Sequence, residues 1–259
     1  VHGVIILQDG ASVAEWYFDG EDERRGSPLG TIAFDAVTQH DIRSVTKSVV
    51  GILAGIAIDQ GAIADLDAPV LDYFPEYADL RTPERLAITL RHALTMTSGL
   101  RWDEETYPYT DPRNSETAMD LAEDPFRHTL SQPIEAPAGA RWAYSGGDVA
   151  LVGEVIARAS GEPLEAFAAR ALFAPLGIAG AEWLTDTKGI PYAASGLRMR
   201  PRDMAKIGEL VRRGGFHDGR RIVSERWIAD SIAPHVSTED DEECPTRYGY
   251  YWWLAPDCE

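Results

Sequence analysis

The segment at residues 43–60 constrains the fold more than any other part of this 259-residue chain. Its apolar residues recur at the three- and four-residue spacing of an α-helix, and they spread over most of the helix surface. A helix of that kind is stable in water only when other segments cover it on nearly all sides. Apolar residues make up 44% of the chain, which is enough to form that cover. The sequence therefore predicts a globular core around one buried helix, ended by Gly61.

The first turn of this helix carries a serine and a lysine three residues apart, Ser44 and Lys47. Residues at that spacing share one face of a helix, so the amine lies one turn above the hydroxyl group. Serine is a weak nucleophile unless a base takes its proton. We expect burial to lower the pKa of Lys47 and to make it a neutral base. The helix N-terminus would also favour the negative charge of a tetrahedral intermediate.

The composition makes the position of Lys47 informative. The chain has three lysines among its 24 basic residues, so arginine is the cation almost everywhere else. Arginine does not lose its proton in proteins, and it could not replace a lysine that acts as a base. The pattern favours a catalytic pair. The structural alternative is that Ser44 caps the helix and Lys47 extends along the surface to reach water.

A second pattern, Tyr144–Asp148 (YSGGD), forms a glycine-rich turn before another predicted helix. Such a turn can present the tyrosine hydroxyl group to a site, and a tyrosinate beside a charged lysine can act as a partner base. Partly buried tyrosines are also common before helices. Alone, this pattern does not assign a function.

The remaining elements are strands first, then many helices, then a strand. The Asp9-Gly10 pair between two apolar runs predicts a β-hairpin, and the polar stretch 20–30 predicts a loop. This order is typical of an α+β fold whose terminal strands pair in one antiparallel sheet. Helices are predicted at 89–96, 148–159, 164–173, 202–213 and 225–232, loops with short helices at 101–140, and an aromatic strand at 248–254.

The two motifs and three further phrases resemble one family in sequence and in order. The phrases are residues 91–100 (RHALTMTSGL), 196–206 (GLRMRPRDMAK) and 248–254 (YGYYWWL). They are similar to the penicillin-recognising, class C β-lactamase-like serine hydrolases, which include β-lactamase-type carboxylesterases and 6-aminohexanoate-dimer hydrolases. The resemblance covers nearly the whole chain. It implies a β-lactamase/transpeptidase-like α+β fold, with an antiparallel sheet flanked by helices.

This architecture divides the chain into two parts. Residues 1–75 and 201–259 would form the sheet domain, and residues 76–200 would form a mainly helical insert subdomain. The site would lie in the cleft between them.

The resemblance also implies a mechanism. Ser44 would attack an ester, amide or lactam carbonyl, and Lys47 and Tyr144 would shuttle its proton. Water would then hydrolyse the acyl-enzyme, and the Ser44 backbone N–H would be one oxyanion donor. No cofactor is expected, and no metal, because the histidines lack metal-ligand spacing. The candidates for the substrate pocket are Gly146, Trp102, Tyr107 and Trp142, although the aromatic residues, Trp142 above all, could instead fill the core.

Two features depart from the family's pattern. The family often has asparagine two residues after the tyrosine, where this chain has Gly146. That amide holds the amide side chain of a β-lactam substrate, so its loss favours an esterase or amidase over a β-lactamase or D-Ala-D-Ala peptidase. The YSGGD form is similar to that of a subgroup close to the 6-aminohexanoate-dimer hydrolases.

The second departure is the family's third motif, a Lys-Thr-Gly or histidine-containing strand that also supplies the second oxyanion donor. It would follow residue 254, and the chain ends before it. We therefore expect a C-terminally truncated sequence, and a missing N-terminus because a strand begins at once after Val1. A catalytically silent sensor or scaffold on the same fold is the alternative from another class of function.

The net charge of −18 makes nucleic acid an improbable partner, because an acidic surface repels phosphate. The expected partner is a small-molecule ester or amide. No apolar run approaches the roughly 20 residues of a membrane-spanning helix. Cys244 and Cys258 are expected to be free thiols, since one pair is no disulfide framework. The sequence leaves the oligomeric state and the compartment open.

Overall fold

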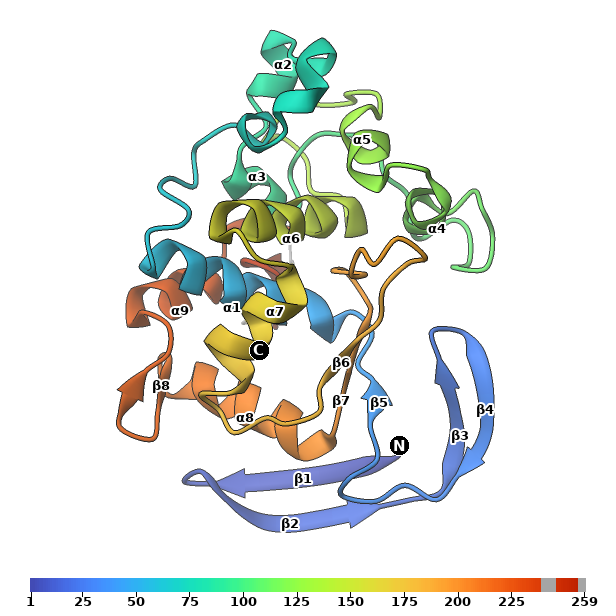
Figure 1. Cartoon of the computed structure of the whole chain (residues 1–259), viewed down its shortest axis with the longest axis vertical. Helices are drawn as coiled ribbons and strands as arrows, with labels where there is room; N and C mark the ends of the chain where they lie inside the picture. The colour runs from blue at the N-terminus through green and yellow to red at the C-terminus, as the bar shows by residue number, and fades with distance from the viewer. Residues whose placement is uncertain (239–245, 256–259) are drawn as a thin grey trace.

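The buried helix predicted at residues 43–60 forms the centre of the protein. The computed structural model describes residues 1–238 and 246–255. Helix α1 (Val45–Asp59) runs between the other layers (Figure 1). Nearly all its apolar side chains are buried. Gly61 follows it with φ of 74°, a left-handed conformation that glycine adopts without strain.

Two glycines let neighbouring segments approach α1 closely. A Cβ atom at Gly51 would lie 2.9 Å from the carbonyl oxygen of Tyr250. A Cβ atom at Gly55 would lie 2.1 Å from the ring of Trp227, whose indole N–H donates to the Gly51 carbonyl oxygen at 3.0 Å. The glycines that interrupt the apolar run therefore hold the C-terminal part of the chain against the central helix.

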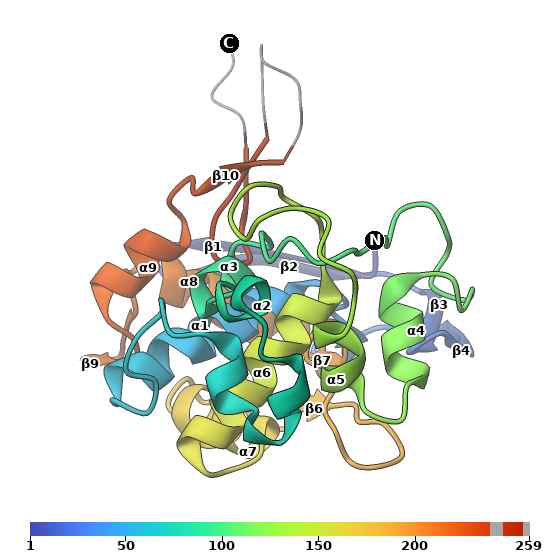
Figure 2. The same ribbon diagram turned by 90° about the horizontal axis from the view of Figure 1, so that it is seen from above.

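Helix α6 (Gly146–Ser160) packs on α1 and carries a layer of shorter helices (Figures 1 and 2). The Ser145 side chain accepts a hydrogen bond from the Asp148 backbone N–H at 3.0 Å and so caps the helix. Gly161 ends it with φ of 74°. The other elements of this layer are η1 (Val70–Tyr73), η2 (Pro75–Leu80), α2 (Pro83–Leu86), α3 (Leu90–Leu94), α4 (Ser115–Leu121) and α5 (Pro125–Leu130).

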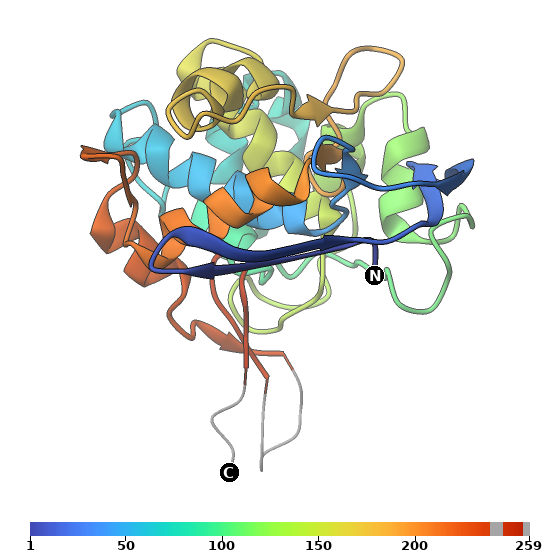
Figure 3. The ribbon, with the colours of Figure 1, turned by 90° about the horizontal axis from the view of Figure 1, so that it is seen from below.

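The remaining helices cover the other side of α1. The structure has α7 (Leu164–Ala168), which continues as a π-helical turn η3 (Ala169–Phe173), α8 (Pro201–Arg212) and α9 (Glu225–Ser231). These confirm the helices predicted at 164–173, 202–213 and 225–232. Helix α8 lies against the N-terminal hairpin, as the view from below shows (Figure 3).

The strands of the described residues form five small antiparallel sheets. The predicted hairpin is confirmed, with Asp9 and Gly10 both at positive φ and Gln8 paired with Ala11. Together with the helices, these sheets confirm an α+β fold. The pairs are β1 (Gly3–Gln8) with β2 (Ala11–Tyr17), β3 (Gly20–Arg24) with β4 (Ser27–Ile32), and β8 (Phe216–His217) with β9 (Arg220–Arg221); β7 (Leu197–Met199) lies between β5 (His40–Asp41) and β6 (Glu182–Trp183), and β11 (Arg247–Tyr248) lies between β10 (Val236–Ser237) and β12 (Trp253–Leu254).

The loop predicted at residues 20–30 is wrong, because β3 and β4 form a second hairpin there. Its tip is Arg25-Gly26, both at positive φ, with Arg24 paired with Ser27. That geometry is the two-residue turn that matches the twist of a hairpin. Most of these side chains face solvent, so the hairpin shows no apolar alternation in the sequence.

The terminal strands do not form one sheet in the part of the chain that is described, contrary to the prediction. The run at 248–254 is not a continuous strand, because the chain turns at Tyr251, whose φ is 64°. The two-residue strands on either side of this turn pair with each other, and β11 also pairs with β10. Strand β1 pairs with β2 instead.

The division at residues 76 and 200 stays a prediction. Strands β6 and β7 belong to the predicted insert, yet β7 pairs with β5 from the predicted sheet domain. Cys244 and Cys258 lie outside the described residues. No helix within the described ranges is long and apolar enough to cross a membrane.

Candidate active site

Ser44 occupies the N-cap position of α1, immediately before its first turn. Ser44 is exposed, and its side chain makes no capping hydrogen bond to the helix. Arg43 precedes it with φ of 49°, so the chain turns sharply into the helix at this point. The hydroxyl group is therefore accessible from solvent and is not engaged in capping.

Lys47 lies one turn further on and points back toward this hydroxyl group. Its Nζ atom lies 3.3 Å from Ser44 Oγ and 3.0 Å from the carbonyl oxygen of Ala194. The residue is only 1% exposed. The structural alternative required a capping serine and a lysine that reaches water, and neither is present.

Tyr144 lies against the same amine from a different segment, the turn that leads into α6. Lys47 Nζ lies 4.9 Å from the centroid of the Tyr144 ring. The structure thus brings together all three residues that the sequence singled out, although Ser44 and Tyr144 are 100 positions apart in the chain.

Two buried carboxyl groups, which the sequence analysis did not single out, complete the surroundings of Lys47. Glu116 Oε2 lies 3.8 Å from Nζ, and the residue is 4% exposed. Glu104 accepts hydrogen bonds at Oε1 from the Trp102 indole N–H and from the Gly146 backbone N–H, both at 2.5 Å. A buried lysine needs counter-charge, but nothing in the sequence shows which of the 42 acidic residues supplies it.

This counter-charge overturns the expectation that Lys47 is a neutral base at rest. Burial acts to lower the pKa of Lys47, as predicted, but Glu116 and, to a lesser degree, Tyr144 and Glu104 act to raise it. The net effect is a pKa above the ordinary value for lysine. The resting site therefore holds a charged ammonium group beside Ser44.

The carboxyl group of Glu104 titrates in an unusual range. Burial and the neighbouring Glu116 raise its pKa to about 7, although Lys47 and the two hydrogen bonds act in the opposite direction. Two carboxyl groups that share one lysine cannot both ionise freely. The Glu104 carboxyl group therefore exchanges its proton near neutrality.

Gly146 is a requirement of this arrangement rather than a spacer. A Cβ atom there would lie 2.5 Å from Glu116 Oε2 and 3.1 Å from Glu104 Oε1. The carboxyl groups occupy the space into which any larger side chain would extend. The asparagine that the family often has at this position would not fit beside them.

A hollow of about 430 Å³ opens beside Tyr144. Trp102 and Trp142 line it, together with Trp253 and Glu104. Trp142 also meets Tyr248 and Trp253 edge-on, with ring centroids 5.6 and 5.4 Å apart, so it has both a packing contact and a face on the hollow.

Tyr107 does not line this hollow. Its ring faces the Arg113 guanidinium group at 4.1 Å, and its carbonyl oxygen accepts a hydrogen bond from the Asn114 side chain at 2.9 Å. The structure therefore does not place Tyr107 with the other pocket candidates around this hollow.

The backbone N–H of Ser44 donates to no backbone carbonyl among the residues that the structure describes, whereas the next three N–H groups donate to Ile42, Arg43 and Ser44. A free N–H beside the nucleophile is the position of an oxyanion donor. Within those same residues, no group of three or more potential ligands could hold a metal ion.

An exposed serine whose hydroxyl lies within reach of a buried lysine is the arrangement of serine acyl-transfer enzymes that use lysine where others use histidine. The family model described as Beta-lactamase matches residues 3–257, so the chain belongs to the β-lactamase family.

Similar proteins agree with that assignment. A 6-aminohexanoate-dimer hydrolase of Paenarthrobacter ureafaciens is 24% identical, over 97% of this chain and 63% of the relative. Esterase EstB of Burkholderia gladioli is 31% identical, over 68% of this chain and 43% of the esterase. The crystal structure of a penicillin-binding protein from Bacillus halodurans has the same fold, with a TM-score of 0.70 at 19% identity, over 98% of this chain and 79% of that one. The chain thus spans less than two thirds of the length of the 6-aminohexanoate-dimer hydrolase and of the esterase.

Proposed function

We propose that the protein is a serine hydrolase that cleaves small esters or amides through an acyl-enzyme on Ser44. Two of its relatives are named as a 6-aminohexanoate-dimer hydrolase and as an esterase, which supports hydrolysis of bonds of this kind. The hollow beside Tyr144 is lined by three tryptophans and three acidic residues, and the tryptophan rings suit the apolar part of such a substrate.

The observation that carries the proposal is the separation of 3.3 Å between an exposed serine hydroxyl and a buried lysine amine. In the first step, Ser44 Oγ attacks the carbonyl carbon, and its proton passes to the Lys47–Tyr144 pair. The Ser44 backbone N–H donates to the oxyanion. The same pair returns the proton to the leaving alcohol or amine, and water then releases the acid and restores Ser44.

Lys47 enters this cycle charged, and so it has no room for the Ser44 proton. Tyr144 lies against Nζ, and as a tyrosinate beside the ammonium group it would accept that proton. The pair therefore acts as one unit, in which the lysine charge stabilises the negative charge that forms on its partners.

A β-lactamase or D-Ala-D-Ala peptidase is the second enzymatic candidate, which the likeness to a penicillin-binding protein favours. The packing around Gly146 counts against it, because carboxyl groups fill the space of the family's asparagine. A catalytically silent sensor would have no need for a buried amine beside an exposed hydroxyl group. We therefore place esters and amides first.

The test is the intact mass of the protein after incubation with a fluorophosphonate. The proposal predicts one adduct on the wild type and none on Ser44→Ala. Ser48→Ala, one turn further along α1, is the matched control, because its hydroxyl donates to the Tyr251 carbonyl oxygen at 2.7 Å and faces no amine. The proposal predicts that Ser48→Ala gains the fluorophosphonate adduct to the same extent as the wild type. An adduct that persists on Ser44→Ala, or no adduct on the wild type, would overturn the proposal.

A further inference from the structure

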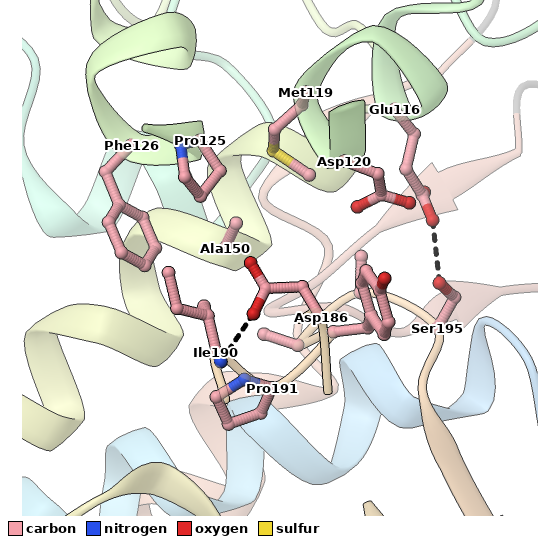
Figure 4. Close-up of a pocket in the computed structure, with 13 residues that line it drawn as sticks. Glu116, Met119, Asp120, Pro125, Phe126, Ala150, Asp186, Ile190, Pro191 and Ser195 are labelled. Carbon is pink, nitrogen blue, oxygen red and sulfur yellow. Dashed lines mark hydrogen bonds between the residues drawn. The ribbon is translucent and has the colours of Figure 1, made fainter. Parts of the chain in front are cut away.

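Glu116 connects Lys47 to a chain of polar contacts that the proposed reaction does not use. Its Oε2 atom faces Lys47 Nζ at 3.8 Å. Its Oε1 atom accepts a hydrogen bond from the Ser195 hydroxyl group at 2.7 Å, which Figure 4 shows as a dashed line. Arg25, at the tip of the β3–β4 hairpin, donates to the same Ser195 hydroxyl oxygen at 2.9 Å. Residues from four separate segments thus meet in one line that ends at the candidate catalytic lysine.

The chemistry of these groups fixes the direction of the line. A guanidinium group can only donate, so the Ser195 oxygen accepts from Arg25. The Ser195 hydrogen is then free to point at Glu116, which must accept it. A carboxylate accepts at every lone pair, whereas a protonated acid does not. The outer end of the line therefore holds Glu116 as an acceptor at Oε1, with its Oε2 atom next to Lys47.

Arg25 is itself held in place on three sides. It forms an ion pair with Asp120, its guanidinium carbon lies 3.4 Å from the centroid of the Tyr192 ring, and its backbone N–H donates to Asp41 at 2.6 Å. A hairpin that the sequence predicted as a loop thus places a fixed cation behind Ser195. A fixed contact of Arg25 with Ser195 is the kind of support that holds a buried group such as the Glu116 carboxylate in one orientation.

We propose that Glu116, oriented by Ser195 and Arg25, is a positioning residue that fixes the ammonium group of Lys47 and keeps it charged in the resting site. The inference rests on the proposed function for the meaning of Lys47, but not for the contacts themselves. It makes the Lys47 charge a property that the fold imposes from outside the three residues that react.

The other groups around the Lys47 amine supply less negative charge to it than Glu116 does. Glu104 faces Lys47 from the segment before α4, Tyr144 faces it from the turn before α6, and Ser44 faces it from α1 itself. Asp120, one turn beyond Glu116 on α4, is turned toward Arg25. Burial and the neighbouring Glu116 raise the pKa of Glu104 to about 7, so it carries only part of a charge near neutrality. Glu116 is thus the principal counter-charge.

The three lysines of the chain allow a direct test that requires no catalysis. Lysine labelled with ¹³C at Cε gives three side-chain signals, and the two from Lys188 and Lys206 are assigned by replacing each with arginine. The pH at which the Lys47 signal titrates is then measured in the wild type and in Glu116→Gln. An opposite charge at this distance raises a lysine pKa by about 1 to 3 pH units, so the variant should titrate at least about one pH unit lower.

Two further variants separate charge from shape. Glu116→Asp keeps the charge and should titrate close to the wild type. Asp203→Asn removes a carboxyl group that is also buried, helical and paired with cations, Arg200 and Lys206, but that belongs to α8. That change should leave the Lys47 signal unmoved even where it lowers stability. Unchanged titration of Lys47 in folded Glu116→Gln would overturn the proposal.

Ser195→Ala provides the test if Glu116→Gln does not fold. Loss of the hydroxyl donor should lower the Lys47 titration point by less than loss of the Glu116 charge does, and no shift in that variant would overturn the proposal in its turn. Fluorophosphonate labelling of the same samples keeps the two questions apart. A wild type that fails to label contradicts the proposed hydrolase, whereas the Lys47 titration alone decides the role of Glu116.

Discussion

Gly146 and Glu116 fit together so closely that a methyl group on the glycine would approach the Glu116 carboxylate oxygen to 2.5 Å. Glu116 lies on α4 and Gly146 begins α6, so this contact joins two helices beside Lys47. The absence of a side chain at residue 146 is therefore what lets a carboxyl group reach the amine.

Gly146→Ala should lower the free energy of unfolding by about 1 to 3 kcal/mol, because the added carbon overpacks a closed site. It should also slow labelling of Ser44, since Glu116 must move. Gly208→Ala is the matched control, because a Cβ atom there meets nothing within 4 Å. That change removes a glycine from the interior of α8, and it should raise the free energy of unfolding by as much as about 1 kcal/mol. Urea unfolding of both variants checks the prediction, which fails if Gly146→Ala is as stable as Gly208→Ala.

The same contact limits the substrates. We expect the wild type to cleave a p-nitrophenyl ester of a short acid with a kcat/KM at least about 100-fold above that for a chromogenic cephalosporin, because residue 146 has no amide to hold the lactam side chain. Gly146→Asn should not restore cephalosporin turnover, since the carboxyl groups leave the new side chain no room. Cephalosporin turnover that equals ester turnover would refute this expectation and favour the β-lactamase candidate.

Trp142 should contribute to substrate binding. The residue lines the hollow beside Tyr144, so removal of its ring takes away apolar contact surface. Trp142→Ala should raise KM about tenfold for an ester with a bulky acyl group, which corresponds to about 1.4 kcal/mol of binding free energy, and should change kcat less. Trp16→Ala, at a ring that is 51% exposed on β2, is the control. Equal effects of the two changes on KM would argue against a substrate-binding role for Trp142.

Asp148, buried near the start of α6, should make stability depend on pH. Burial raises its pKa to about 8 from an ordinary value of 3.8, and the nearby Ser98 opposes this only in part. Because the folded form holds the proton more tightly, the protonated Asp148 contributes to the free energy of unfolding. This contribution is fully present below pH 4 and is lost as the pH rises from about 4 to about 8. The greatest slope is about 1.4 kcal/mol per pH unit.

Asp148→Asn should remove this dependence, so its stability relative to the wild type should rise between pH 4.5 and pH 8. Glu154→Gln, on the outer part of the same helix, should follow the wild-type curve. Chemical unfolding at several pH values provides the measurement. If Asp148→Asn and the wild type lose stability in parallel, the carboxyl group is not protonated in the folded state.

The sequence predicted those parts of the fold that depend on local spacing. Helices such as α1 and α6 follow from apolar periodicity, and the first hairpin follows from Asp9-Gly10. The hairpin at Arg25-Gly26 could not be predicted in the same way, because its strands are polar on most of their surface. The turn at Tyr251 interrupts an aromatic run whose composition is that of a strand.

The same contrast applies to the site. Ser44 and Lys47 share one helix turn, so their spacing in the sequence was sufficient to pair them. Glu116 reaches Lys47 only through the packing of α4, which no local pattern encodes. The direction of the Lys47 pKa was wrong for this reason, because the sequence indicated burial of the amine but not its counter-charge.

If Lys47 activates Ser44 for acyl transfer, an ester substrate should leave its acyl group on that serine. The most direct measurement is the intact mass of the protein, quenched within seconds of mixing with a p-nitrophenyl ester, followed by mapping of the modified peptide. We expect an acyl group on Ser44 in the wild type, and in Lys47→Met a rate of acylation that is lower by a factor of about 10² to 10⁴. An acyl group at another residue, or equal rates with and without the lysine, would contradict it.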